Sequence, residues 1–136
     1  MPNSNRELIV STINWAALQT AAKNAAAQAY APYSQFPVGV AVLAENDQIY
    51  TGCNVENASY GGTICAERNA IAAAVVHGQR KFKALMVYTP QEKLTPPCGL
   101  CRQVIAEFFL PESPIASCNH TGQQQSWTLQ QLFPDA

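Results

Sequence analysis

Two short segments of the chain, Cys65 to Arg68 and Pro97 to Cys101, contain the residue types best suited to chemistry. Each lies where a helix is expected to begin, and the free backbone N–H groups and positive dipole end of a helix start stabilise thiolates. A structural zinc site usually has four protein ligands, whereas a catalytic one has three and leaves the fourth position to water. The segments therefore predict a zinc site of the catalytic type with Cys65, Cys98 and Cys101 as ligands.

Two charged residues closely follow Cys65. Glu67 is about 200° around an ideal helix from Cys65, so its carboxylate can approach the metal only over the open helix end, as an acid/base group that stays unbound. Arg68 is three residues from Cys65 and shares its side of the helix, so its guanidinium can hydrogen-bond a ligand sulfur and offset the excess negative charge of three thiolates. The alternatives are a solvated acid for Glu67 and a surface salt bridge for Arg68.

The cysteine pattern also allows a simpler interpretation. A lone Cys-x-x-Cys is most often a metal clip or a redox pair, and the remaining cysteines could be small buried residues. The order of residues is more specific, because a Cys, one residue, a Glu and then Pro-Cys-x-x-Cys is the all-cysteine version of the zinc deaminase signature. The full pattern favours a zinc deaminase, with Cys53 and Cys118 outside the site.

Alternating helix and strand patterns must position these segments. We expect helices at Leu8 to Tyr30, Cys65 to Val76, Gly99 to Phe109 and, as a short one, Trp127 to Leu132. We expect strands at Val38 to Leu43, Gln48 to Val55, Ala84 to Tyr88 and Ile115 to Cys118, the first two forming a hairpin. The polar segment Asn119 to Ser126 has no clear pattern. This order predicts an α/β fold with a mixed sheet, parallel where helical crossovers join its strands.

Composition limits the class of protein. The 136 residues suit one compact domain over residues 1–136, and only 12% of them are charged, against about 25% in a typical soluble domain, which predicts surface covered by other chains. A formal net charge of -1 argues against DNA or RNA as a partner. No stretch approaches the roughly 18 apolar residues of a membrane span, and five cysteines suit a reducing compartment, so we expect a cytosolic (cytoplasmic) protein without a membrane partner.

Four stretches of the sequence together resemble one family. They are Tyr30 to Gly39, Gly52 to Ala58, Cys65 to Arg68 and Pro97 to Gln103. With these motifs the chain resembles the short cytidine deaminases that bind zinc through three cysteines. The resemblance implies a three-layer α-β-α sandwich with a five-stranded mixed sheet, and a homotetramer. It also implies hydrolysis of cytidine and deoxycytidine to uridine and deoxyuridine with release of ammonia, a reaction of pyrimidine salvage.

The resemblance also assigns roles at the metal. Cys65, Cys98 and Cys101 match the ligands of one Zn²⁺ ion per chain, which would lower the pKa of water so that hydroxide can attack C4 of the pyrimidine. Glu67 matches the proton shuttle, which takes the water proton and delivers it to N3 and then to the departing amino group. The backbone N–H of Ala66 would bind the base.

Other residues are expected to bind the nucleoside. Asn54 and Glu56 lie two apart at the end of an expected strand, so their side chains face the same way and could hold one ribose. The resemblance assigns both to its 3′ side. Phe36 resembles the ring that packs on the pyrimidine, although plain core packing is the alternative. Ala58 and Tyr60 resemble residues that reach the nucleoside of a neighbouring subunit.

Three functions from different classes fit the motifs. They are deamination of free nucleosides, a related deaminase acting on an aminonucleoside antibiotic or on nucleic acid, and a non-enzymatic zinc module. The motifs Asn54 to Asn57 and Cys65 to Arg68 favour the first over the antibiotic type, and the lack of a basic surplus disfavours nucleic acid. The zinc module predicts a fourth protein ligand and an inert Glu67. No arginine pair for a phosphate lies near the ribose motif, so nucleotides are expected to be poor substrates.

Overall fold

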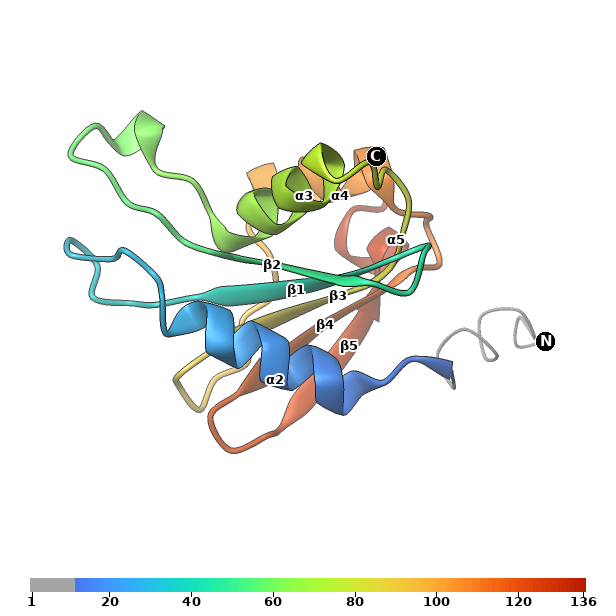
Figure 1. Ribbon diagram of the computed structural model, residues 1–136, viewed down its shortest axis with the longest axis horizontal. Helices are drawn as coiled ribbons and strands as arrows, with labels where there is room; N and C mark the ends of the chain where they lie inside the picture. The colour runs from blue at the N-terminus through green and yellow to red at the C-terminus, as the bar shows by residue number, and fades with distance from the viewer. Residues whose placement is uncertain (1–11) are drawn as a thin grey trace.

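The fold is built around one sheet with helices on both of its faces (Figure 1). The computed structural model describes residues 12–136. The strands are β1 (Gly39–Ala44), β2 (Ile49–Cys53), β3 (Phe82–Thr89), β4 (Pro114–Asn119) and β5 (Gln124–Thr128). The helices are α2 (Trp15–Ala26), α3 (Ala66–Val76), α4 (Gly99–Phe108) and α5 (Leu129–Leu132), with a 3₁₀ turn η1 at Tyr60–Gly62.

The order of strands in the sheet is β2-β1-β3-β4-β5. β1 pairs antiparallel with both β2 and β3, β3 and β4 pair in parallel, and β4 and β5 pair antiparallel. The parallel pair is the one joined by the α4 crossover, as the order of elements predicts. Because β2 and β3 both run antiparallel to β1, their carboxyl ends lie at the same end of the sheet. The loops that lead into α3 and α4 start there.

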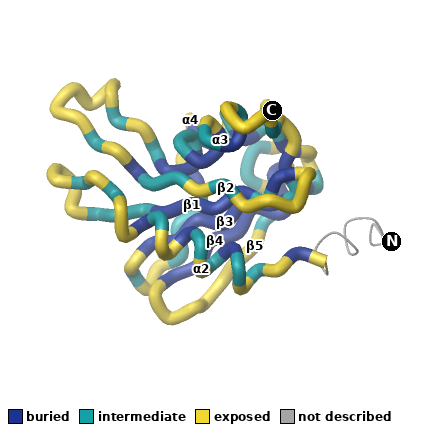
Figure 2. The backbone as a smooth tube through the Cα atoms, in the orientation of Figure 1, coloured by how far each residue is buried: buried dark blue, intermediate teal, exposed yellow. Residues whose placement is uncertain are grey.

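Each face of the sheet carries its own core. α2 covers one face, where Leu18 and Ala22 pack with Ala41 and Met86 of the strands. The other face lies under α3, α4 and α5, and its core cluster combines residues of those helices with side chains of β1, β3 and β4. Figure 2 shows that the three central strands β1, β3 and β4 are mostly buried, whereas the edge strands β2 and β5 and the connecting loops are more exposed. The expected three-layer α-β-α sandwich with a five-stranded mixed sheet is therefore confirmed.

Two glycines allow helices to lie close to the sheet. A Cβ atom on Gly39 would lie 1.9 Å from the carbonyl oxygen of Ala22 in α2, and one on Gly52 would lie 2.3 Å from the backbone nitrogen of Ala70 in α3. Both distances are far below van der Waals contact, so only glycine permits these approaches. Gly52 thereby sets how closely α3 lies against β2.

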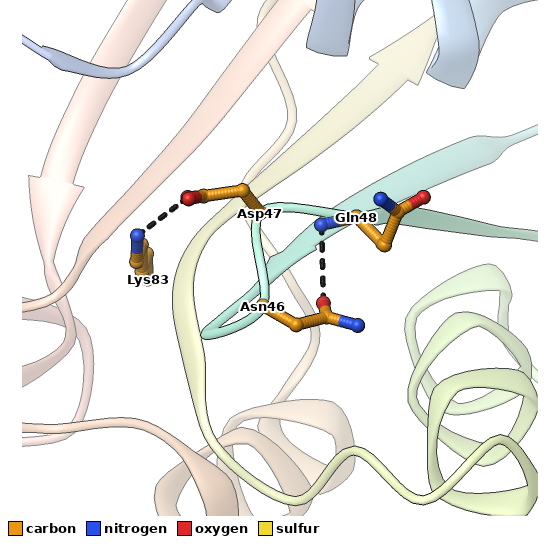
Figure 3. Close-up of polar contacts among 4 residues, drawn as sticks. All are labelled: Asn46, Asp47, Gln48 and Lys83. Carbon is orange, nitrogen blue, oxygen red and sulfur yellow. Dashed lines mark hydrogen bonds and ion pairs between the residues drawn. The ribbon is translucent and has the colours of Figure 1, made fainter.

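β1 and β2 form the hairpin that the sequence predicts, with a polar turn. Asp47 has φ 66°, a left-handed conformation that Asp and Asn tolerate better than most residues. The Asn46 side-chain oxygen accepts a hydrogen bond from the backbone N–H of Gln48 at 3.1 Å, and Lys83 Nζ lies 2.5 Å from Asp47 Oδ1 (Figure 3). The turn is thus held by one hydrogen bond within it and by one ion pair with the neighbouring strand β3.

The chain before β1 departs from the expected helix. α2 ends at Ala26 instead of Tyr30, because Tyr30 pairs with the chain that follows β2. Its N–H donates to the carbonyl oxygen of Asn54 at 3.0 Å, and Glu56 N–H donates to the Tyr30 carbonyl oxygen at 2.8 Å. The second expected strand likewise ends early, at Cys53. The segment at Tyr30 is therefore hydrogen-bonded to the segment from Asn54 to Glu56, which contains two of the residues expected to bind the nucleoside.

Capping side chains set the ends of two helices. Asn14 precedes α2, and its side-chain oxygen accepts a hydrogen bond from the first turn at 3.0 Å. The expected start of this helix, Leu8 to Ser11, lies outside the described residues. Thr128 precedes α5 and forms a reciprocal capping box with Gln131. The prediction that this last helix begins at Trp127 was wrong, because Trp127 belongs to the edge strand β5.

Candidate functional site

Three cysteines from two helix starts come together at the end of the sheet where β2 and β3 finish. The Sγ atoms of Cys65, Cys98 and Cys101 all lie within 4.8 Å of one another. Tetrahedral zinc has Zn–S bonds of about 2.3 Å, which place its sulfur ligands roughly 3.8 Å apart, so the group fits a zinc ion after small adjustments. Cys101 is buried, Cys65 is half-buried and Cys98 is exposed, so the group opens to solvent beside Cys98.

Cys65 and Cys98 occupy equivalent positions before their helices. Each is the N-cap residue in extended backbone, with φ -69° and ψ 153° for Cys65 and φ -70° and ψ 170° for Cys98. Neither side chain makes a capping hydrogen bond, which leaves both sulfurs for a metal. The unpaired N–H groups and positive dipole ends of α3 and α4 both lie at the cysteine group, where they favour thiolates.

The thiols of the group differ in acidity. The pKa of Cys65 is lowered to about 5, chiefly because the Cys101 thiol donates a hydrogen bond to the Cys65 thiolate, with help from Arg68. The same hydrogen bond, together with burial, raises the pKa of Cys101. Zinc is bound by thiolates, so the binding of zinc must displace the proton of Cys101. The affinity of the site for zinc should therefore rise with pH.

Glu67 lies beside the three cysteines without joining them. It is in the first turn of α3 and is buried, with 6% of the residue exposed. Burial raises the pKa of Glu67, and the charge on Cys65 raises it further. Within residues 12–136, no fourth Cys, His, Asp or Glu belongs to the group. A buried carboxyl next to three metal ligands suits proton transfer to or from a molecule bound there.

Arg68 contacts the cysteine group from α3. Its Nη2 lies 3.7 Å from Cys65 Sγ and donates to the Thr63 carbonyl oxygen at 3.3 Å. The hydrogen bond to Cys65 raises the pKa of the guanidinium, which therefore remains a cation beside the sulfurs. Its Nε is buried and has no acceptor among residues 12–136. The contacts with a sulfur and a carbonyl fit the expected charge offset better than a surface salt bridge.

Asn54 holds the loop that precedes β1. It is buried, its Nδ2 donates to the Phe36 carbonyl oxygen at 2.9 Å, and its Oδ1 accepts from Val38 N–H at 2.9 Å. The amide keeps one further donor and one further acceptor site. Asn54 is therefore at once a structural bridge to Phe36 and a residue with hydrogen-bonding capacity left for a ligand.

Glu56 contacts the same loop. Its carboxylate accepts hydrogen bonds from the N–H groups of Tyr33 and Ser34 and from the Ser34 hydroxyl. The bond from the Ser34 hydroxyl is the main reason why the pKa of Glu56 is lowered. Sequence reasoning missed these contacts, and the one signal for them was a serine within a proline-containing turn, where its hydroxyl commonly bonds nearby groups.

The remaining expected nucleoside residues fall into two places. Ala66 is the buried first residue of α3, and its backbone N–H has no acceptor within the helix. Ala58 and Tyr60 lie instead on the loop that projects beyond the sheet (Figure 1), where Tyr60 is 85% exposed. The chain therefore brings Ala66 to the cysteine group and presents Ala58 and Tyr60 outward.

Arg102 positions the second cysteine segment, a contact that sequence reasoning missed. Its Nε donates to the Pro97 carbonyl oxygen at 2.7 Å, and its Nη1 donates to the Leu132 carbonyl oxygen at 2.8 Å. The segment that contains Cys98 is thereby tied to α5. The sequence shows that Arg102 directly follows the ligand Cys101, but it does not show that Arg102 bonds to the distant residue Leu132.

Known proteins match both the sequence and the fold. The family model of the cytidine and deoxycytidylate deaminase zinc-binding region matches residues 14–117. The cytidine deaminase of Sporosarcina psychrophila is 51% identical over 114 residues, which are 84% of each chain. The crystal structure of the cytidine deaminase from Burkholderia pseudomallei has a TM-score of 0.86 and 41% identity, over 91% of this chain and 99% of that one. The crystal structure of the cytidine deaminase from Mycobacterium tuberculosis has a TM-score of 0.79 and 39% identity, over 91% of this chain and 97% of that one.

The fold and the three-cysteine group define a zinc enzyme with an α-β-α sandwich. The chain belongs to the cytidine deaminase family. The expected enzyme class and the expected cofactor, one zinc ion per chain, are confirmed. Within residues 12–136, every helix is too short or too polar to cross a membrane.

Replacement of one ligand should remove the metal. Cys98→Ala leaves two sulfurs, so zinc content measured on purified protein should fall from one ion per chain to near zero. Cys118→Ala is the control, because Cys118 is buried in β4 on the α2 side of the sheet and should leave zinc in place. Full zinc content in Cys98→Ala, or two ions per chain in the unaltered protein, would contradict the site.

Proposed function

We propose that the chain catalyses the zinc-dependent hydrolysis of cytidine and deoxycytidine to uridine and deoxyuridine with release of ammonia, a step of pyrimidine salvage. The observation that carries this proposal is the buried Glu67 beside, but outside, the group of three cysteines. A structural zinc module would need a fourth protein ligand and would have no use for a buried acid. The names of the matching relatives support the choice of substrate.

Cys65, Cys98 and Cys101 would hold the zinc ion, which would lower the pKa of a water molecule for attack on C4 of the pyrimidine. Glu67 accepts the first proton of that water and delivers it to N3, and then moves the second proton to the amino group. The water oxygen forms a bond to C4, the bond from C4 to the amino nitrogen breaks, and ammonia leaves. Burial of Glu67 supports this role, because its proton passes to the substrate instead of to bulk solvent.

The nucleoside is held from several directions in this proposal. Phe36 packs on the pyrimidine, and the N–H of Ala66 donates to the base. Asn54 and Glu56 hold the 3′ side of the ribose. An ionised Glu56 can only accept hydrogen bonds, so its partner is a hydroxyl, and its charge repels a phosphate. Nucleotides are therefore poor substrates.

Neighbouring copies of the chain complete the site. The two loops that project beyond the sheet expose several large apolar side chains, those of Tyr30, Tyr33, Val55, Tyr60 and Ile64. Exposed apolar surface of this kind typically marks an interaction surface. We assign it to a homotetramer, in which Ala58 and Tyr60 reach the nucleoside of a neighbouring subunit.

Residues 1–136 form a single domain of this type, which we place in the cytoplasm. The free cysteines of the described chain support a reducing compartment. The net charge of -1 supports a free nucleoside as the substrate and gives no reason for a nucleic-acid or membrane partner.

Removal of the proton shuttle should abolish turnover without removing the metal. Glu67→Gln is expected to keep zinc and fold and to lose about 10²–10⁴-fold in kcat, the usual contribution of general acid/base catalysis. The loss of the cytidine absorbance band measures the rate. Glu107→Gln, an exposed carboxyl on α4, is the matched control and should retain activity. Near-normal kcat in Glu67→Gln would reject the assigned role.

Assembly and substrate size can be tested together. Light scattering should give a mass of about four times 14.7 kDa, and the tetramer should deaminate cytidine and deoxycytidine. Its kcat/KM for cytidine monophosphate should be at least about tenfold lower, because the carboxylate of Glu56 lies at the sugar. Single-stranded nucleic acid should not react. A fully active monomer would remove the composite site, and equal kcat/KM for nucleoside and nucleotide would remove the ribose pocket.

A further inference from the structure

Ser34 lies between two of the residues that the proposed function places around the nucleoside. Its hydroxyl donates a hydrogen bond to Glu56 Oε2 at 2.5 Å and accepts one from the backbone N–H of Phe36 at 3.1 Å. Its own backbone N–H donates to Glu56 Oε1 at 3.1 Å. One serine therefore binds both oxygens of the Glu56 carboxylate and the backbone of Phe36.

The Glu56 carboxylate keeps one acceptor position. An ionised carboxylate accepts about four hydrogen bonds. In the described part of the chain, Oε1 accepts from the N–H groups of Tyr33 and Ser34, and Oε2 accepts from the Ser34 hydroxyl. The latter bond lowers the pKa of Glu56, so the group stays ionised and cannot donate. The remaining position on Oε2 therefore suits a hydroxyl donor, and Ser34 sets its direction.

The loop around Ser34 is held in one conformation. Gln35 has φ 55°, in the left-handed region, and its N–H donates to the carbonyl oxygen of Ala31 at 2.9 Å, which closes a tight turn. Phe36 is then fixed at both backbone polar groups, by Ser34 at the N–H and by Asn54 Nδ2 at the carbonyl oxygen. A serine hydroxyl has a single donor, and Glu56 occupies it, so Ser34 cannot donate a hydrogen bond to a substrate and influences it through Glu56 and Phe36.

We propose that Ser34 is a positioning residue that sets the selectivity of the site for nucleosides with a 3′-hydroxyl. It orients the carboxylate of Glu56 so that the remaining position of Oε2 meets that hydroxyl, and it fixes the backbone of Phe36 beside the base. This role rests on the proposed function, which places Glu56 at the sugar and Phe36 at the base. The contribution of Glu56 to discrimination between sugars, beside that of Asn54, then depends on Ser34.

The test compares Ser34→Ala with the unaltered protein on cytidine and on 3′-deoxycytidine, which lacks the hydroxyl in question. Loss of a hydrogen bond to a charged group should raise KM for cytidine about tenfold, whereas kcat should stay within about twofold because the zinc site and Glu67 are unchanged. For 3′-deoxycytidine the loss of kcat/KM should be several-fold smaller, because this nucleoside has no 3′-hydroxyl for Glu56 to bind and is affected only through the backbone of Phe36. Ser34→Thr keeps the O–H and should restore KM. Ser126→Ala, at an exposed serine of β5, is the control.

The outcomes of this comparison distinguish a failure of the role assigned to Ser34 from a failure of the proposed function. Equal losses of kcat/KM for both nucleosides, or an unchanged KM for cytidine, would overturn the role of Ser34. Failure of Ser34→Thr to restore KM, with zinc content and circular dichroism unchanged, would overturn it as well. A zinc-loaded unaltered protein that leaves cytidine intact would instead overturn the proposed function, and the role of Ser34 with it. Turnover of cytidine by the unaltered protein thus separates the two failures.

Discussion

Three sulfur ligands within 4.8 Å of one another are the arrangement on which the rest of the structure depends. Thiolates repel each other, so the group needs positive charge from the starts of α3 and α4, from Arg68 and from the metal. The sheet topology supplies both helix starts, because β2 and β3 run in the same direction and each continues into a helix from the same end of the sheet. Gly52 then allows α3 to lie close enough to β2 for Cys65 to meet Cys98 and Cys101 at the start of α4.

The chain that leaves β2 links the cysteine group to the side chains that we propose to bind the nucleoside. It runs from Asn54 and Glu56, whose side chains hold the loop before β1, to Cys65 and Glu67 at the start of α3. The bridge between Tyr30 and this segment fixes the two loops to each other. A shift of α3 against the sheet would therefore move the cysteine group relative to Asn54 and Glu56, the side chains that we propose to hold the sugar.

Local signals made much of this arrangement predictable. α3, α4, β3 and β4 all lie within two residues of their expected bounds, because apolar patterns and helix-start residues mark them directly. β5 could not be predicted, since its exposed residues Gln124 and Gln125 have no apolar alternation and become a strand only by pairing with β4. The contacts of Ser34 with Glu56 and of Arg102 with Leu132 join residues 22 and 30 positions apart. Such contacts follow from tertiary packing, which residue spacing does not contain.

A metal position left open by the protein is what separates a catalytic zinc site from a structural one. X-ray absorption at the zinc K-edge of the purified protein measures it most directly. We expect three sulfur ligands at about 2.3 Å and one oxygen or nitrogen ligand that exchanges with solvent. Four sulfur ligands, or three sulfurs with an imidazole from the chain, would contradict a catalytic site, because no position would remain for the water molecule that the proposed reaction needs.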